Sequence, residues 1–382
     1  MDLVLSEEQE LLARTAREFV SGRSSLKRVR RLRDTQDADG FSRELWGEMA
    51  ALGWLGINVP EEYGGAGLGW LELMVVMEEV GRGLMPEPMI STILMGSTAL
   101  LLGGSEAQKK EHLPPIVAGE RLITIAHKEA GSRYLAAHIG TRAEKSGSSY
   151  LLRGEKINVP DGHVADWLIV SARTSGGTRD PGGITQFLVR ADTPGITIER
   201  LSRIDSRNAA RVRFDDVRVG ADAVLGTLDH AATLIARTAD RAMIGLTAEM
   251  LGSMSAALEM TLEYLRTRVQ FGVLIGTFQA LKHRAATMYI ESELARSAVM
   301  GAHRAIDEGR DDATIARLAS IAKTRCNDAF NLIAKEGVQM HGGIGMTDEH
   351  DIGFYLKRAR VAEMMFGDSA YHRDRYARLE GY

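Results

Sequence analysis

The sequence predicts an α+β protein, mostly α-helical, in which a middle β domain separates two helical regions. Three observations support this fold class. Apolar residues recur at helical spacing up to about residue 120, short alternating segments fill residues 121–230, and long runs with few breakers follow from residue 231. We therefore expect an N-terminal α-helical domain over 1–120, a middle β-barrel or sheet domain over 121–230, and a C-terminal helical bundle over 231–382.

The N-terminal region begins with a helix-start signal. Ser6 followed by Gln9 forms a capping box, and the apolar residues after it fall on one helical face. A second helical start lies at residues 41–57. A glycine-rich turn over 60–69 interrupts the pattern, and another helical run covers 70–83.

The middle region consists of short segments separated by Gly, Pro and Asp. The candidate strands are SYLLRGEKINV, WLIVSART, ITQFLVRA, GITIERL and ARVRFDDVRV. The stretch SGGTRDPGG (175–183) has the composition of an exposed turn. Long helical runs then cover residues 232–268, 278–308, 312–335 and about 355–365, and their short polar connections indicate an antiparallel bundle.

Composition excludes several classes of protein. A net charge of -4 gives no electrostatic footprint for nucleic acid, and the basic run over 23–33 is interpreted as a solvated helical face. The apolar stretch 89–102 is too short to span a bilayer, and the acidic N-terminus is unlike a signal peptide. The single cysteine, Cys326, is interpreted as a buried structural thiol. We expect a cytoplasmic protein.

Four motifs follow one another along the chain. They are PEEYGGAG (60–67), RVRFDDVRV (211–219), RVQFG (268–272) with Phe278-Gln279 shortly after, and QMHGGIG (339–345). In this order they resemble the acyl-CoA dehydrogenase family over nearly the whole chain. The resemblance implies a C-terminal four-helix bundle, FAD as cofactor and an acyl-CoA thioester as substrate. It further implies a homo- or heterotetramer (or dimer) and an electron acceptor such as an electron-transfer flavoprotein, in fatty acid or steroid side-chain oxidation.

The resemblance assigns one set of residues to the FAD of a neighbouring subunit. Arg268 suits a bidentate pair with the pyrophosphate, Phe271 suits packing on adenine or ribose, and Gln279 offers a donor and an acceptor. Gln339, Met340, Gly342 and Gly343 complete the set, the glycines by letting the backbone approach the cofactor. Each residue alone also fits a purely structural interpretation, as a helix end or a core side chain, which their joint spacing disfavours.

The catalytic base of the family is missing. Met365-Phe366-Gly367-Asp368 stands where the family has Tyr-Glu-Gly-Thr, and phenylalanine cannot take a proton, although its N–H could still polarise a thioester carbonyl. The alternative base position falls on Ala242. Asp240 is the remaining candidate base, but its position favours a substrate contact or a helix-start carboxylate over a base. The resemblance assigns the substrate to the following residues: Ser132, Asp240, Arg241, Met243, Phe366 and Gly367.

The segments that hold the flavin ring in the family are also altered. His127 and Lys128 replace the residues of the Leu-Thr-Glu-Pro motif, and Asn158-Val159-Pro160 replaces Trp-Ile-Thr. The residues expected at the chain's own flavin are therefore His127, Lys128, Asn158, Pro160 and Asp368. His127 and Lys128 could stabilise a reduced flavin or simply end a strand. No histidine has metal-ligand spacing, so we expect no metal site.

Three functions remain open. The first is an acyl-CoA dehydrogenase, either a complete enzyme whose base is Asp240 or another carboxylate not identified by the motifs, or one subunit of a mixed tetramer. In the mixed tetramer the partner supplies the base and the ring-binding residues. The second is a flavin-dependent monooxygenase on the same fold, which needs no α-proton base. The third is a non-catalytic acyl-CoA-binding subunit.

Overall fold

The computed structural model describes residues 4–382, and the chain divides by its internal contacts into two compact units. Unit 1 contains the chain up to Asp34 together with Gly69–Met85 and Met243–Tyr382. Unit 2 contains Thr35–Leu68 and Pro86–Ala242. The boundaries predicted at about residues 120 and 230 are not those of the two units, and they remain a prediction about the sequence.

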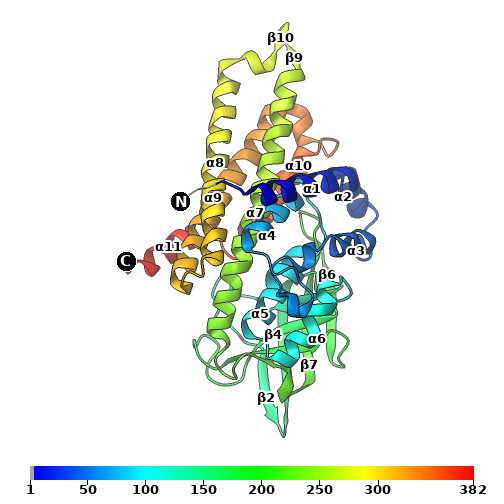
Figure 1. Cartoon of the computed structure of the whole chain (residues 1–382), viewed down its shortest axis with the longest axis vertical. Helices are drawn as coiled ribbons and strands as arrows, with labels where there is room; N and C mark the ends of the chain where they lie inside the picture. Colours follow the sequence, from blue (N-terminus) through cyan, green and yellow to red (C-terminus); the bar gives the residue numbers. More distant parts are fainter. Residues whose placement is uncertain (1–3) are drawn as a thin grey trace. The chain divides into compact units, whose positions relative to one another are not determined.

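Unit 1 is almost entirely helical (Figure 1). Its elements are α1 (Glu7–Arg23), α2 (Leu26–Asp34), α4 (Trp70–Arg82), the larger part of α7 (Ala231–Thr267), α8 (Gln279–Asp307), α9 (Asp312–His341), the 3-10 helix η6 (Gly342–Met346), α10 (Ile352–Met364) and α11 (Ser369–Leu379). The capping box at α1 is confirmed, because the Ser6 hydroxyl accepts from the Gln9 N–H and the Gln9 amide accepts from the Ser6 N–H. The helix α11 was not predicted.

The long helices of unit 1 pack at close range because glycine lies where α4 meets α7. A Cβ on Gly252 would fall 1.7 Å from the Glu78 carbonyl oxygen, and a Cβ on Gly81 would fall 1.9 Å from the Glu249 carbonyl oxygen. Beside this crossing, the fully buried Glu249 carboxylate accepts from Arg358 of α10 at 2.9 Å. Paired burial of this kind satisfies two charges that the core could not hold singly.

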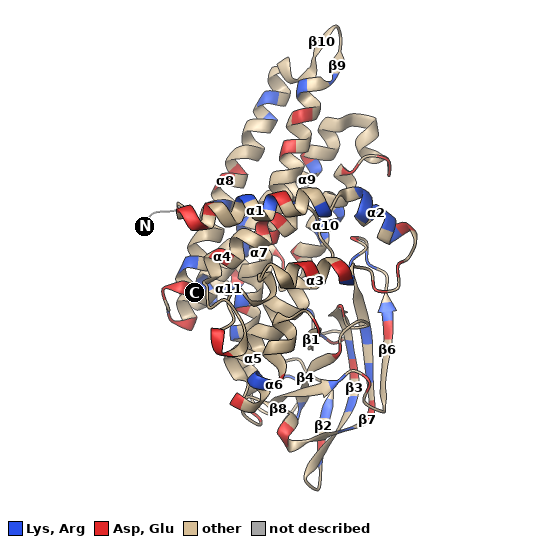
Figure 2. Cartoon of the chain, turned by 45° about the vertical axis from the view of Figure 1, so that its right-hand side comes forward, with Lys and Arg blue, Asp and Glu red and all other residues tan. Residues whose placement is uncertain are grey.

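The basic run over 23–33 extends from the last residue of α1 into α2, so its predicted helical character is present. Arg30 and Arg33 are paired rather than solvated, and that part of the prediction was wrong. In Figure 2 the ribbon of α2 is largely blue, the colour of lysine and arginine. Arg30 donates to Asp351 at 2.8 Å and Arg33 donates to Asp348 at 2.6 Å. Both guanidinium groups also lie over the ring of Phe354, at 4.8 and 5.2 Å from its centroid. The run therefore docks α2 onto α10 and its preceding loop.

Unit 2 combines short helices with a sheet. Its helical elements are α3 (Arg43–Ala51), η1 (Trp54–Gly56), η2 (Glu61–Tyr63), the π-helix η3 (Met89–Ser97), α5 (Thr98–Gly103), α6 (Glu106–Val117) and η4 (Ala221–Ala223). Its strands are β1 (Ile123–Ala126), β2 (Arg142–Ser146), β3 (Ser149–Pro160), β4 (Trp167–Arg173), β5 (Ile184–Arg190), β6 (Ile196–Leu201), β7 (Ala209–Gly220) and β8 (Val224–Leu225). The apolar stretch over 89–102 is buried in η3 and α5.

The sheet of unit 2 is mixed and has the order β6-β7-β3-β2-β4-β5-β8, with β1 parallel to β4. All five predicted strands are present, as β3 to β7. The strands β1, β2 and β8 were missed because they are short, and β1 is buried on both faces and so shows no alternation. The core of the sheet is built from inward-facing apolar residues of β3, β4, β5 and β7.

A small hairpin joins α7 to α8. The strands β9 (Val269–Gln270) and β10 (Val273–Leu274) pair around Phe271 and Gly272, and the 3-10 helix η5 (Ile275–Thr277) follows. Both turn residues have positive φ, 54° and 79°. That is the backbone of the two-residue turn that suits a hairpin's twist.

Within residues 4–382, no helix is long and apolar enough to cross a membrane. Among the same residues, no group of three or more His, Cys, Asp or Glu side chains is arranged to hold a metal ion.

Candidate functional site

The Arg268 segment lies at the exposed end of unit 1. Arg268 follows the last turn of α7, where its N–H donates to the Tyr264 carbonyl at 2.9 Å. Its side chain makes no ion pair within residues 4–382. Phe271 at the hairpin turn is 91% exposed, the most exposed phenylalanine of the described chain, and Gln279 begins α8. The Phe271 ring has an edge-to-face contact with Phe278, 6.1 Å between ring centroids, and Gln279 is exposed. Most of the surface of the Phe271 ring therefore faces outward.

The second predicted cofactor segment is the turn that ends α9. Gln339 is exposed, and Gly342 has φ 66° and ends the helix. A Cβ at Gly342 or Gly343 would meet nothing within 4 Å, so these glycines leave open space rather than fill a crowded one. Gly345 differs, because its Cβ would lie 2.5 Å from the Val338 carbonyl oxygen. Met340 is buried and supports the turn from inside.

In unit 2, the altered flavin segments come together where β1 and β3 end. The Ile157 N–H donates to the Lys128 carbonyl at 2.8 Å, and the Thr124 hydroxyl donates to the Pro160 carbonyl at 2.7 Å. His127 is held through Nδ1, 2.9 Å from the Ser171 hydroxyl. Burial, with Lys156 close by, lowers the pKa of His127 to about 4, so this imidazole is neutral at physiological pH.

A buried ion pair underlies these segments. The Lys156 ammonium donates to the Glu129 carboxylate at 2.6 Å, and Glu129 also accepts from the Thr141 N–H and hydroxyl at 2.9 and 2.7 Å. Burial lowers the pKa of Lys156 to about 8 against the pull of Glu129. Burial opposes ionisation of Glu129, but Lys156 and Thr141 leave its pKa below the ordinary value. Glu129 therefore has a structural role. Lys156 was not predicted, because no sequence pattern indicates that it pairs with Glu129.

The residues that replace Trp-Ile-Thr offer little to a flavin ring. Pro160 has neither a side-chain hydroxyl nor an N–H, and its carbonyl already accepts from Thr124. Asn158 is exposed in the left-handed region, with φ 49°. Lys128 is half-buried, and burial lowers its pKa. The two donors that a threonine would contribute are absent from this position, so position 160 cannot serve a flavin ring as a threonine would.

The candidate base Asp240 is buried in α7, with 6% of its surface exposed. Arg241, its neighbour, donates to the Arg237 carbonyl at 3.3 Å. Ala242 is fully buried. A role for Asp240 as general base, or at the substrate, stays a prediction.

Phe366 packs into the core of unit 1 rather than standing free. It is half-buried against a cluster that includes Met243 and Ile244 of α7 and residues of α8 and α9. Two residues predicted at the substrate, Met243 and Phe366, are thus in one apolar cluster. Phe366 has φ 59° and Gly367 has φ 129°, a turn that costs a phenylalanine about 1–3 kcal/mol in strain.

A buried lysine of α9 holds this turn in place. The Lys323 ammonium donates to the carbonyls of Gly367 and Ala362, both at 3.0 Å, and of Glu363 at 3.1 Å, and to the Asn327 amide oxygen at 2.6 Å. Its acceptors lie at the carboxyl end of α10, where a helix dipole favours a cation. Burial lowers the Lys323 pKa to about 7. Lys323 was not predicted, because a lysine within a helical segment is normally expected to be exposed to solvent.

Two further predicted site residues have local structural partners. The Asp368 carboxylate caps α11 by accepting from the Tyr371 N–H at 2.9 Å. The buried Ser132 hydroxyl donates to the Glu129 carbonyl at 2.8 Å. Each side chain is used within its own loop, and roles at FAD or substrate remain predictions for both.

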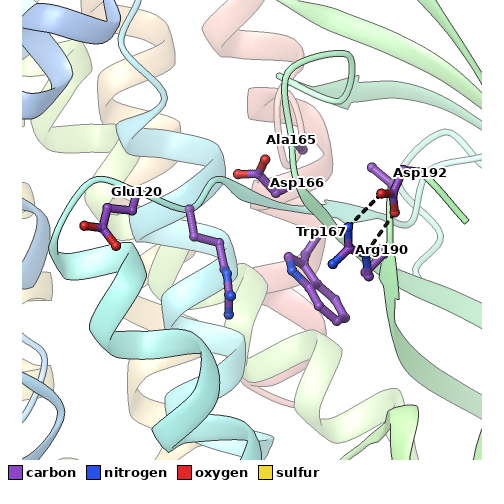
Figure 3. A pocket seen from close by; sticks show the side chains of 8 residues that line it. Glu120, Ala165, Asp166, Trp167, Arg190 and Asp192 are labelled. Atoms are coloured by element: carbon purple, nitrogen blue, oxygen red, sulfur yellow. Dashed lines mark hydrogen bonds and ion pairs between the residues drawn. The ribbon is translucent and has the colours of Figure 1, made fainter.

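A polar pocket of about 330 Å³ lies elsewhere in unit 2, where β4 begins and β5 ends. Figure 3 shows Trp167 beside Arg190, whose guanidinium pairs with Asp192 at 2.7 Å. The Asp166 carboxylate accepts from the Leu122 N–H at 2.7 Å. The pocket contains none of the predicted site residues, and two of its carboxylates, Asp166 and Asp192, already bind groups of the chain itself.

All three regions of the chain match models of known protein families. Models of the acyl-CoA dehydrogenase N-terminal, middle and C-terminal domains match residues 6–120, 123–217 and 232–379. Mitochondrial isovaleryl-CoA dehydrogenase of Pongo abelii is 32% identical over 377 residues, which cover 97% of this chain and 88% of the relative.

Solved structures give the same result. The chain is 32% identical to a chain of the Tcur3481–Tcur3483 steroid ACAD, in a variant form, with a TM-score of 0.87 over 98% of both chains. It is 28% identical to a chain of the ChsE4–ChsE5 complex from Mycobacterium tuberculosis, with a TM-score of 0.88 over 100% of both chains. Both of these structures are assemblies named for two different chains.

Proposed function

Because the chain belongs to the acyl-CoA dehydrogenase family, whose members are flavoprotein oxidoreductases acting on adjacent carbons of an acyl-CoA, we propose that it works as one subunit of a mixed assembly. In this assembly the chain contributes its Arg268 hairpin and its Gly342–Gly343 turn to FAD held mainly by a homologous partner. The partner contributes the catalytic carboxylate and the residues that hold the flavin ring.

One contrast carries the proposal. The segments that would reach a neighbour's cofactor present exposed groups, with Phe271 91% exposed and open space at Gly342 and Gly343. The groups that would serve the chain's own site are absent or occupied, since Phe366 packs in the core and Pro160 lacks donors. A chain retaining only the first set fits a supporting subunit.

The residues present suit specific parts of FAD. Arg268 offers a bidentate donor pair to the pyrophosphate, Phe271 an aromatic surface to the adenine or ribose, and Gln279 and Gln339 uncommitted amides. When bound, FAD supplies the hydride acceptor for the β-carbon of the acyl chain. An electron-transfer flavoprotein suits the role of the electron acceptor that reoxidises it.

The Tcur3481–Tcur3483 and ChsE4–ChsE5 assemblies support a mixed rather than a uniform oligomer. The former is named as a steroid ACAD, which favours a large alicyclic acyl-CoA as the substrate class. The monooxygenase and the non-catalytic binding protein are not favoured, because the named relative is a dehydrogenase and family matches span all three regions.

The experiment that tests this proposal compares FAD content in two preparations. The chain is purified alone and co-purified with a homologue that retains the glutamate base, and each visible spectrum is recorded before and after anaerobic addition of an acyl-CoA. We expect little flavin in the chain alone and a flavin band that bleaches in the mixed assembly. A chain that binds FAD alone and bleaches with thioester would contradict the proposal.

A matched pair of variants sharpens the comparison. Arg268→Ala is expected to lower the FAD affinity of the mixed assembly by about tenfold to a hundredfold, as loss of a charge-assisted contact should. Arg266→Ala removes an exposed arginine from the last turn of α7 and should leave FAD affinity unchanged. Equal effects of the two variants would remove the assigned role of Arg268.

A further inference from the structure

Three aromatic rings connect the two cofactor-facing segments of unit 1. The Tyr264 ring of α7 lies 4.6 Å from the His341 ring of α9, between ring centroids, and the His350 ring lies 4.2 Å from His341 on the loop before α10. Tyr264 accepts the N–H of Arg268 through its carbonyl, and His341 directly precedes Gly342. The stack therefore joins the start of the hairpin to the start of the glycine turn.

The hydrogen bonds of the stack fix the tautomers of both histidines. Nδ1 of His341 lies 2.7 Å from the Gly337 carbonyl, so it carries the proton and leaves Nε2 as the unprotonated nitrogen. Nδ1 of His350 accepts from the Ile352 N–H at 3.2 Å, so its proton is on Nε2. Both rings are then neutral and hold their positions without an ion pair.

A second proton on His341 would lie on Nε2, which has no hydrogen-bond acceptor nearby in the described part of the chain. Its side chain is 2% exposed, and its Nε2 has no hydrogen-bond partner within residues 4–382. The groups that face it are the Tyr264 ring from α7 and the His350 ring from the loop. Asp351 acts in turn on His350 and is itself paired with Arg30 of α2 at 2.8 Å. Burial, with a smaller contribution from His350, lowers the pKa of His341.

We propose that the Tyr264–His341–His350 stack is a positioning device that holds the Arg268 hairpin and the Gly342–Gly343 turn in one fixed relation, and that protonation of His341 releases them. The inference rests on the proposed function for its purpose, because a cofactor in a neighbouring chain must meet both segments at once. His341 is a positioning residue, since it acts through the two segments rather than on the cofactor.

The sign of the pH effect follows from the tautomers. A proton on Nε2 would be buried without an acceptor beside a second imidazole, so the closed stack disfavours the charged form. As pH falls below the ordinary histidine value of 6.5, an open stack binds the proton better and becomes more populated. Fixed placement is therefore present at neutral pH and is lost on acidification.

Hydrogen exchange on the purified full-length chain tests the coupling directly. His341→Ala should raise exchange at amides 264–275 as well as 338–346 by about tenfold, because local opening frees both segments. Tyr264→Leu should reciprocally raise exchange at 338–346, and its use guards against misfolding of the alanine variant. Faster exchange confined to the segment that carries the substitution, in both variants, would overturn the proposal.

The pH dependence separates positioning from simple packing. His341→Phe keeps a neutral ring in the stack, so it should hold both segments closed from about pH 7 to about pH 5, where the wild type opens. His283→Phe changes an exposed histidine of α8 and should leave the wild-type pH dependence intact. Identical acid opening in His341→Phe and wild type would exclude His341 as the titrating group.

The FAD affinity of the mixed assembly distinguishes the two proposals. Loss of FAD on acidification that His341→Phe prevents supports both. Normal FAD loading with uncoupled segments overturns the stack alone. Coupled segments in an assembly that binds no FAD overturn the proposed function, and the purpose of the stack with it.

Discussion

Phe366 shows how a single side chain changes the role of a site while the surrounding backbone stays in place. The turn that carries it has a left-handed φ, and Lys323 and Asn327 both donate to the Gly367 carbonyl behind it. A Cβ at Gly367 would fall 2.4 Å from the Tyr371 ring, so glycine is required there. The support of the turn is intact, and the phenylalanine side chain belongs to the apolar cluster with Met243.

The first prediction concerns this position. Phe366→Glu should lower the free energy of unfolding by about 1–3 kcal/mol, because a carboxylate would replace an aromatic ring in an apolar cluster without a partner. It should not give the chain alone a flavin band that bleaches with acyl-CoA, since the donors lost at Pro160 are not restored. Urea denaturation and anaerobic spectra measure the two effects. Phe366→Leu, which stays apolar, is the control, and bleaching by Phe366→Glu alone would contradict us.

At the scale of elements, the helices of unit 1 depend on close approach at two glycines. Gly81 of α4 and Gly252 of α7 each face a carbonyl oxygen of the other helix, at distances that no Cβ tolerates. The buried Arg358–Glu249 pair then ties α10 to α7 beside the crossing. The helix α7, which ends at the hairpin, is therefore held by close backbone approach to α4 as well as by apolar burial.

The second prediction follows from this crossing. Gly252→Ala should destabilise the chain by about 1–3 kcal/mol or more, because the new methyl group forces α4 away from α7. Gly301→Ala lies in α8 where a Cβ meets nothing within 4 Å, so it should be neutral or stabilise by up to about 1 kcal/mol. Urea denaturation of both variants measures the difference. Equal stabilities would show that the helices adjust freely.

At the scale of the whole molecule, the surface of the β9–β10 hairpin is unusually apolar and is a candidate interface. Five apolar residues of the hairpin and its flanks are exposed in sequence order: Val269, Phe271, Val273, Leu274 and Phe278. Tyr289, Ile290 and Leu294 of α8 are also exposed, at 58, 56 and 48%. Contiguous apolar surface of this kind marks an interaction site rather than a solvated face.

The third prediction tests that surface. Phe271→Asp should leave the stability of the isolated chain within about 0.5 kcal/mol, because the ring makes little contact within its own chain. The same change should weaken assembly with the homologous partner, as measured by sedimentation at several concentrations. Leu11→Asp alters another exposed apolar residue, 58% exposed on α1, and should not affect assembly. A Phe271→Asp chain that assembles normally would contradict the assignment of the hairpin.

Regular elements were predictable because their signals are local. The Ser6–Gln9 capping box, the alternation in β3 to β7 and the long runs of α7, α8 and α9 each depend on residues close in sequence. The exposed loop at 175–183 and the buried Cys326 were predictable in the same way. Short strands such as β1 escaped prediction, since four buried apolar residues carry no period.

The sequence by itself determined the fold class, the family and the absence of a base at position 366. Residue identity alone shows this last point, because the phenylalanine side chain cannot accept a proton. Only the tertiary structure decided which polar groups already have hydrogen-bond or ion-pair partners within the chain. Residues distant in sequence determine the burial of Lys156 and Lys323 and the hydrogen bond to the Pro160 carbonyl. They also determine the position of His341 between Tyr264 and His350. Such pairings arise when separate elements pack, and no local pattern encodes them.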